Sequence, residues 1–137
     1  RPRASSARSA TTWPDCRNRY SVTTHQLDVG VQVDIHNLHA EAGATEEDQR
    51  LSSEDFMQLA DFINDHSAGR AVILGGDTNL HTEDGHPDGS GVADTEIWET
   101  FNQATGFTDV CDQISPCEGS IDRFAFSSSD TITIVPL

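Results

Sequence analysis

The stretch AVILGGDTN at residues 71–79 decides the fold. Its first four residues are all apolar, which predicts a short strand that is buried on both faces of a sheet. Two glycines follow, and they let the backbone turn sharply and leave room for a ligand. Asp77 and Asn79 then stand at the carboxyl end of the strand, where α/β proteins usually bind their ligands.

These two side chains have complementary chemistry. The carboxylate of Asp77 can orient a water or hold a divalent cation, and the amide of Asn79 can donate to a phosphate oxygen without adding negative charge. The alternative is an Asx turn, in which Asp77 only caps the local backbone. The motif alone leaves both interpretations open.

The sequence on both sides of this stretch predicts alternating strands and helices. A helix with an apolar stripe begins at a capping-box-like Thr45 and Asp48, and a second helix ends near Gly106. We expect strands at residues 20–27, 31–39, 71–74, 120–126 and 131–135, and helices at residues 46–66 and 93–105. This order predicts an α/β layer structure.

Two polar residues follow the alternating strand at residues 31–39. Val31, Val33 and Ile35 alternate with polar residues, and the same alternation predicts that Asn37 and His39 face the core at the strand end. A histidine there can donate to a phosphate oxygen or act as a general acid or base, although a core histidine with internal hydrogen bonds is the alternative. We expect the other strand and helix histidines, His25, His36 and His66, to be ordinary surface or strand residues.

A third acidic residue, Asp122, lies between apolar neighbours in the stretch SIDRF at residues 120–124. The alternative to a functional role is a partly buried pair of Asp122 with Arg123 or with the backbone. Three motifs of this chain, taken together and in this order, resemble those of the endonuclease/exonuclease/phosphatase superfamily. They are Asn-x-His (37–39), Gly-Asp-x-Asn (76–79) and Ile-Asp-Arg (121–123). The resemblance covers roughly residues 20–137 and implies a partial two-sheet α/β sandwich of the deoxyribonuclease-I-like fold.

The resemblance also implies an activity, the metal-dependent hydrolysis of a phosphate ester that is a nucleic acid, a phospholipid or a small phosphoester. His39 would bind and protonate around the scissile phosphate, with Asn37 in support. Asp77 would align the attacking water, Asn79 would hold the phosphate, and Asp122 would orient a catalytic histidine. The expected cofactor is Mg²⁺ or another divalent cation, held by Asp77 and Asn79.

The chain departs from the family pattern at both ends. The family has an N-terminal half with an Asn and a metal-binding Glu, and it closes with a Ser-Asp-His motif; this chain contains neither. We therefore expect a fragment of a longer enzyme that has little or no activity alone and is marginally stable. The competing hypotheses are a non-catalytic pseudoenzyme or binding module with the same fold, and an acidic protein that binds divalent ions.

A glycine-rich acidic loop at residues 84–90 suggests a calcium site, but Thr95 stands where an EF-hand needs Glu. We interpret it as a loop near the active face, from which His81 and His86 can approach a substrate or metal.

Charge is distributed unevenly along the 137 residues, whose net charge is −15. Residues 1–19 hold five arginines and one acidic residue, and residues 20–137 hold three arginines and 22 acidic residues. We interpret residues 1–19 as a disordered or non-native segment and residues 20–137 as the partial domain. A body with a charge of −19 excludes a broad basic surface for nucleic acid, and no apolar run is long enough to span a membrane.

The three cysteines do not have the spacing of a zinc site. Cys111 and Cys117 can form a disulfide in an oxidising compartment. Cys16 would then be the one cysteine outside this pair. No apolar signal-peptide region is present in residues 1–12. The resemblance favours a secreted or extracytoplasmic location, because relatives with similar cysteine spacing would often be exported.

Overall fold

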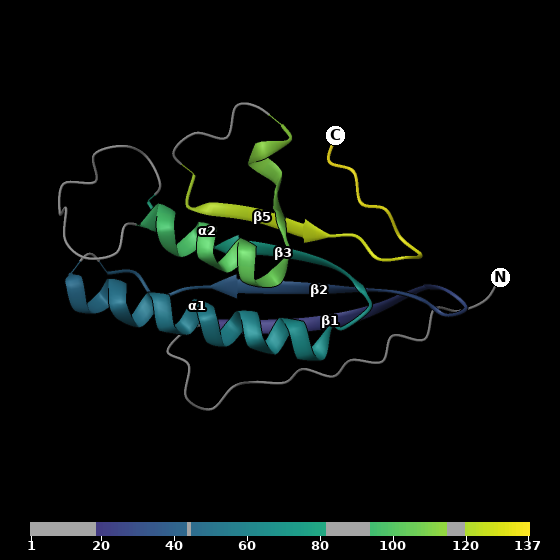
Figure 1. The fold of residues 1–137 in the computed structure, drawn as a ribbon, viewed down its shortest axis with the longest axis horizontal. Coiled ribbons are helices and arrows are strands. Elements are labelled where there is room, and N and C mark those ends of the chain that lie inside the picture. Colours follow the sequence, from purple (N-terminus) through teal and green to yellow (C-terminus); the bar gives the residue numbers. More distant parts are fainter. Residues whose placement is uncertain (1–18, 44, 82–93, 115–119) are drawn as a thin grey trace.

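Five strands form one mixed sheet in this computed structural model, and two helices cover one of its faces (Figure 1). The structure describes residues 19–43, 45–81, 94–114 and 120–137. The elements in chain order are β1 (Arg19–Asp28), β2 (Val31–His39), α1 (Glu46–His66), β3 (Ala71–Asp77), α2 (Asp94–Thr105), β4 (Thr108–Asp109), the short 3-10 helix η1 (Val110–Asp112) and β5 (Asp122–Ser127).

The strand order in the sheet is β1-β2-β3-β5-β4. β2 and β3 are parallel and are joined through α1, and the other neighbouring strands are antiparallel. The carboxyl ends of β2 and β3 therefore lie at the same edge of the sheet, next to the start of β5. The predicted α/β class is confirmed. The described residues form one sheet, so the second sheet of a sandwich stays a prediction.

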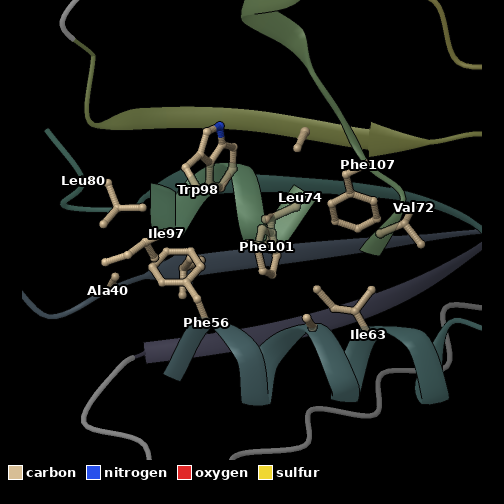
Figure 2. Packing of buried hydrophobic residues seen from close by; sticks show 13 residues of the cluster. Ala40, Phe56, Ile63, Val72, Leu74, Leu80, Ile97, Trp98, Phe101 and Phe107 are labelled. Carbon is tan, nitrogen blue, oxygen red and sulfur yellow. The ribbon is translucent and has the colours of Figure 1, made fainter. Parts of the chain in front are cut away.

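The core lies between the helices and the sheet (Figure 2). α1 contributes Phe56, Ala60 and Ile63, which lie on one side of the helix because they are spaced by three or four residues. Phe56 meets Phe101 of α2 edge to face, with ring centroids 5.3 Å apart. This packing holds both helices against the same face of the sheet.

The start of α1 is the capping box that the sequence predicts. The Thr45 hydroxyl accepts a hydrogen bond from the Asp48 backbone at 3.1 Å, and the Asp48 carboxylate accepts one from the Thr45 backbone at 3.1 Å. The helix begins at Glu46 and ends at His66, as expected.

The prediction that Asn37 and His39 face the core is wrong. In β2 the buried face towards the helices carries Asp34, His36 and Leu38, while Asn37 and His39 are exposed on the opposite face. Asp34 and His36 are fully buried because hydrogen bonds with β1 and with the residues that follow α1 satisfy them. His36 is thus a strand histidine, as one of the two predicted alternatives has it, but it is fully buried.

Two further strand predictions need correction. Ile73 is only partly buried, so β3 is not covered on both faces along its whole length. Residues 131–135 form no strand, and the backbone there is held instead by the Ser128 and Ser129 hydroxyls. Among the described residues, neither helix has both the length and the apolar character needed to cross a membrane.

Some predictions fall outside the described residues. These are the character of residues 1–18, the loop at residues 84–90 with His86, and the pairing of Cys16 and Cys117. Cys111 is in a disulfide.

Candidate functional site

Three side chains predicted to carry function lie in one row across the sheet. His39 of β2 pairs in register with Asp77 of β3, and Asp77 pairs with Asp122 of β5. His39 and Asp122 are exposed, and Asp77 is partly exposed. The His39 Nε2 atom is 3.8 Å from Asp77 Oδ2, with 60% of the histidine side chain and 31% of the aspartate side chain exposed. The row is therefore open to a ligand from solvent.

Gly76 allows β2 and β3 to approach closely beside this row. Its φ is +143°, and a Cβ on it would lie 1.9 Å from the backbone oxygen of Leu38. Gly75 lies under the ring of Phe124, which a Cβ would meet at 2.5 Å. The prediction that the strand ends at residue 74 and turns sharply at the two glycines is wrong, because β3 continues in register to Asp77. The glycines serve close contacts with β2 and β5 instead.

Asn79 joins the ends of β2 and β3. Its backbone N–H donates to Asp77 Oδ1 at 2.9 Å, and its side-chain amide donates to the Ala40 backbone oxygen at 2.6 Å. The Ala40 N–H in turn donates to the Asp77 backbone oxygen at 2.8 Å. The Asx turn that the sequence left open is therefore present. It occupies Oδ1 of Asp77 and leaves Oδ2 on the side of His39.

Thr78 contributes to the site although the sequence did not single it out. It is 2% exposed, and both its backbone N–H and its hydroxyl donate to the Ile121 backbone oxygen, at 2.9 and 2.8 Å. This double contact fixes the residue before Asp122 against the end of β3. The position of a threonine directly after Gly-Gly-Asp was the available sequence signal for this role. The sequence does not show its partner, Ile121, because the two residues are distant in the chain.

Asp122 and Arg123 point to opposite faces of the sheet. Arg123 is 6% exposed, lies 3.5 Å from the Asp109 carboxylate and stands over the Trp98 ring at 5.7 Å. The predicted alternative of an Asp122–Arg123 pair is thus not what the structure shows. Asn37 lies on the exposed face two residues before His39, opposite Gly75 in register.

The donor chemistry of the row suits a hard divalent cation. Asp77 and Asp122 offer two carboxylates in adjacent register positions, and Mg²⁺ is usually held by one or two carboxylates while it keeps several waters. No group of three His, Cys, Asp or Glu close enough to hold a metal occurs within the described ranges. The Asn79 amide nitrogen already donates a hydrogen bond to Ala40. Asn79 can therefore bind a metal through its side-chain oxygen, but it can donate to a phosphate only if the amide nitrogen gives up its contact with Ala40. His81 uses its backbone N–H to bind the Asp94 carboxylate at 2.8 Å.

A second polar cluster lies on the helix face, away from this row. His36 contacts the Tyr20 hydroxyl through Nδ1 and the Ser67 hydroxyl at 2.8 Å through Nε2. Ser67 donates to Asp34 at 2.7 Å. Burial lowers the pKa of His36 to about 4, so the ring is neutral at pH 7, and burial also raises the pKa of Tyr20 above its usual value.

Asp34 carries the negative charge of this cluster. Burial alone would raise its pKa, but hydrogen bonds from Thr24, Ser67 and Arg70 and the charge of Arg70 hold the pKa below its usual value. Thr24 donates at 2.6 Å and the Arg70 Nε at 2.7 Å. The cluster is fully engaged in holding β1, β2 and the end of α1 together, and we assign it a structural role.

Comparisons with known proteins agree with the fold that the sequence predicts. No protein-family model matches the chain. The chain is similar to a sphingomyelinase of Mycobacterium bovis, with 30% identity over 110 residues that cover 75% of this chain and 20% of the relative. It thus spans about one fifth of the length of the curated relatives that it matches.

Solved structures show the same fold. The catalytic domain of human nocturnin, solved with a bound sulfate anion, superposes with a TM-score of 0.60 at 18% identity, over 79% of this chain and 40% of that chain. An endonuclease/exonuclease/phosphatase family protein of Bacteroides thetaiotaomicron superposes with a TM-score of 0.57 at 17% identity, over 82% of this chain and 43% of that chain. The chain therefore has the fold of the endonuclease/exonuclease/phosphatase superfamily, as the resemblance of its three motifs predicts.

Proposed function

We propose that this chain supplies part of the active site of a metal-dependent phosphoester hydrolase, and that the phosphate binds at the row of His39, Asp77 and Asp122. One observation carries the proposal. Three polar residues from distant parts of the sequence occupy adjacent register positions at one edge of the sheet, on its exposed face. The similarity to a sphingomyelinase supports the same reaction class.

The proposed roles follow from which atoms are open. His39 Nε2 faces the row and can donate to, or protonate, an oxygen of the phosphate. Asp77 has Oδ1 fixed by the Asn79 backbone, so its Oδ2 is positioned to accept a hydrogen bond from an attacking water. Asn37, on the same face, can donate to the phosphate beside His39.

Asp122 completes the row and can orient a histidine or water brought to it. Asp77 and Asp122 would hold the divalent cation, with the Asn79 side-chain oxygen as a further candidate ligand. When bound, such a cation supplies charge neutralisation of the phosphate and lowers the pKa of a bound water. We also propose that a second sheet completes a two-layer sandwich with the sheet described here. The isolated chain should then show little or no turnover.

The test therefore rests on binding and does not require turnover. ¹⁵N-labelled chain is titrated with inorganic phosphate in buffer with MgCl₂, and backbone amide shifts are recorded. We expect the largest shifts at His39, Asp77 and Asp122 and their neighbours. Asp77→Asn keeps the acceptor for the Asn79 backbone but removes the charge, and it should change the affinity for Mg²⁺ and phosphate at least about tenfold.

Asp130→Asn is the matched control. Asp130 is exposed and follows the far end of β5, so its loss should leave the titration unchanged. Shifts that avoid the row, or an affinity that is the same in Asp77→Asn and the unaltered chain, would count against the proposal. A site that binds phosphate but is unaffected by Mg²⁺ would favour the alternative, a non-catalytic binding module.

A further inference from the structure

Thr78 joins the end of β3 to the start of β5 beside the row. It directly follows Asp77, the last residue of β3, and its partner Ile121 directly precedes Asp122, the first residue of β5. The backbone N–H of Thr78 donates to the Ile121 oxygen at 2.9 Å, and its hydroxyl donates to the same oxygen at 2.8 Å. The contact therefore continues the pairing of the two strands one residue beyond the pair of Asp77 and Asp122.

The pair of Asp77 and Asp122 depends on this support because it is the last pair of the β3–β5 ladder. The end of a ladder opens more easily than its middle, since ordered neighbours hold it on one side only. Asp122 is also exposed, so packing of its own side chain contributes little to its position. A further hydrogen bond, from the Ser120 hydroxyl to the Asp122 backbone oxygen at 2.8 Å, is local and does not tie β5 to β3. The contact of Thr78 with Ile121 does tie them.

The Thr78 hydroxyl is a buried link between the turn after β3 and the start of β5. It accepts a hydrogen bond from the Leu80 N–H at 3.3 Å while it donates to Ile121. Thr78 is 2% exposed, so water does not compete for either hydrogen bond. The same turn contains Asn79, whose backbone N–H holds the carboxylate of Asp77. One hydroxyl thus couples the two strand ends that carry the carboxylates of the row.

We infer that Thr78 is a positioning residue for cation binding, and that its hydroxyl holds the Asp122 carboxylate where it shares a divalent cation with Asp77. The inference rests on the proposed function, because it concerns the cation proposed for the same two carboxylates. Mg²⁺ demands a near-ideal octahedral geometry, so its affinity falls when one of two carboxylates moves away from the other. Thr78 therefore acts on the cation through Asp122 and not as a ligand.

Two substitutions separate the hydroxyl from the rest of the side chain. Thr78→Val removes the hydroxyl and keeps the branched shape, and Thr78→Ser keeps the hydroxyl and removes the methyl group. Thr105→Val is the matched control, because the Thr105 hydroxyl also donates to a backbone oxygen, that of Phe101 at 2.9 Å, but does so within α2. Circular dichroism and the amide spectrum establish that each variant is folded in the titration buffer.

The measurement uses Mn²⁺ as a paramagnetic substitute for Mg²⁺ on the ¹⁵N-labelled chain, since both ions take octahedral oxygen ligands. In the unaltered chain we expect the amides of Asp77 and Asp122 to be broadened together. In Thr78→Val the broadening at Asp122 relative to that at Asp77 should fall at least about twofold, and the Kd for Mg²⁺ should rise about fivefold. Thr78→Ser and Thr105→Val should stay within about twofold of the unaltered chain in both quantities.

The outcomes distinguish positioning from stability and from the proposed function. A role of Thr78 in stability alone would lower the unfolding midpoint and leave the ratio of the two broadenings unchanged, and that result overturns the inference. An effect of Thr78→Ser as large as that of Thr78→Val also overturns it, since the hydroxyl is then not the cause. If Mn²⁺ broadens neither Asp77 nor Asp122 in the unaltered chain, the proposed function fails and the inference fails with it.

The unaltered chain also provides a test that needs no variant. The amides of Thr78 and Leu80 donate to Ile121 and to the Thr78 hydroxyl, so they should exchange with solvent at least about tenfold more slowly than in an unfolded peptide. Exchange of either amide at the unfolded rate would show that the link is not formed. That result overturns the inference even if Thr78→Val does not fold.

Discussion

The side-chain amide of Asn79 donates to the backbone oxygen of Ala40 at 2.6 Å and so joins the ends of β3 and β2. Asn79 holds this contact with a φ of +50°, a conformation that asparagine tolerates better than most residues. Asn79→Ala loses the hydrogen bond and adds backbone strain. We expect it to lower the free energy of unfolding by about 2 kcal/mol in urea denaturation.

Asn79→Gly separates the two causes. Glycine adopts a positive φ freely, so only the hydrogen bond is lost, and the loss should be about 1 kcal/mol. Equal losses for the two variants would show that the backbone conformation contributes nothing.

Gly76→Ala should be far more damaging than the same change at another glycine with positive φ. A Cβ at Gly76 would lie 1.9 Å from the Leu38 oxygen, so β2 and β3 must move apart. We expect a loss of more than about 3 kcal/mol, measured by thermal and urea unfolding. Gly30 in the β1–β2 turn has a φ of +72° and open space around it, and Gly30→Ala should cost only about 1 kcal/mol. Similar losses at both positions would contradict the close approach of the strands.

The buried His36 predicts a loss of stability in mild acid. Its pKa is about 4 in the folded chain and near 6.5 when it is unfolded, so the unfolded state binds the proton first as the pH falls. Stability from this group is complete above pH 6.5 and decreases as the pH drops towards 4, by at most about 3 kcal/mol. The measurement is the free energy of unfolding against pH.

His36→Gln should flatten this pH dependence even if it lowers stability at pH 7. His25→Gln is the control, because His25 is exposed on β1 and its replacement should leave the slope unchanged. Asp34 affects stability in a separate pH range. Because its pKa is lowered in the fold, its contribution to the free energy of unfolding is complete above about pH 3.8 and is lost only below that value. An unchanged slope in His36→Gln would show that the pKa of His36 does not differ between the folded and the unfolded chain.

Asp109 supports two buried partners. Its Oδ2 accepts a hydrogen bond from Trp98 Nε1 at 2.6 Å and lies 3.5 Å from Arg123 Nη1. Asp109→Ala removes the charge that balances Arg123 and should cost about 3 kcal/mol, measured by circular dichroism during urea unfolding. Asp109→Asn keeps an acceptor for Trp98 and should lie between Asp109→Ala and the unaltered chain. A cost equal to that of Asp109→Ala would assign the whole effect to the charge.

The elements that depend on local signals could be predicted from the sequence. The capping box fixes the start of α1 at Glu46, and the apolar spacing of Phe56, Ala60 and Ile63 identifies its core face. The motif order also predicted that His39, Asp77 and Asp122 belong together, and the strand register places them in one row.

The face of β2 could not be predicted, because its buried polar residues depend on distant partners. Asp34 and His36 look like solvent-facing positions beside Val33 and Ile35, yet Ser67 and Arg70 satisfy Asp34 from beyond the end of α1. For the same reason the sequence does not identify Ile121 as the partner of Thr78 or Ala40 as the partner of Asn79. Hydrogen-bond partners from elsewhere in the chain outweigh the polarity pattern of a single strand.

The row at positions 39, 77 and 122 also links function to the order of folding. No two of its members are neighbours in the sequence, and each comes from a different strand. Their meeting requires two long loops to close, and β2 pairs with β3 only after the α1 segment has crossed the sheet. Helical signal can therefore recover quickly in a refolding experiment while ligand binding lags. Ligand binding then reports the last sheet pairing and not the early collapse.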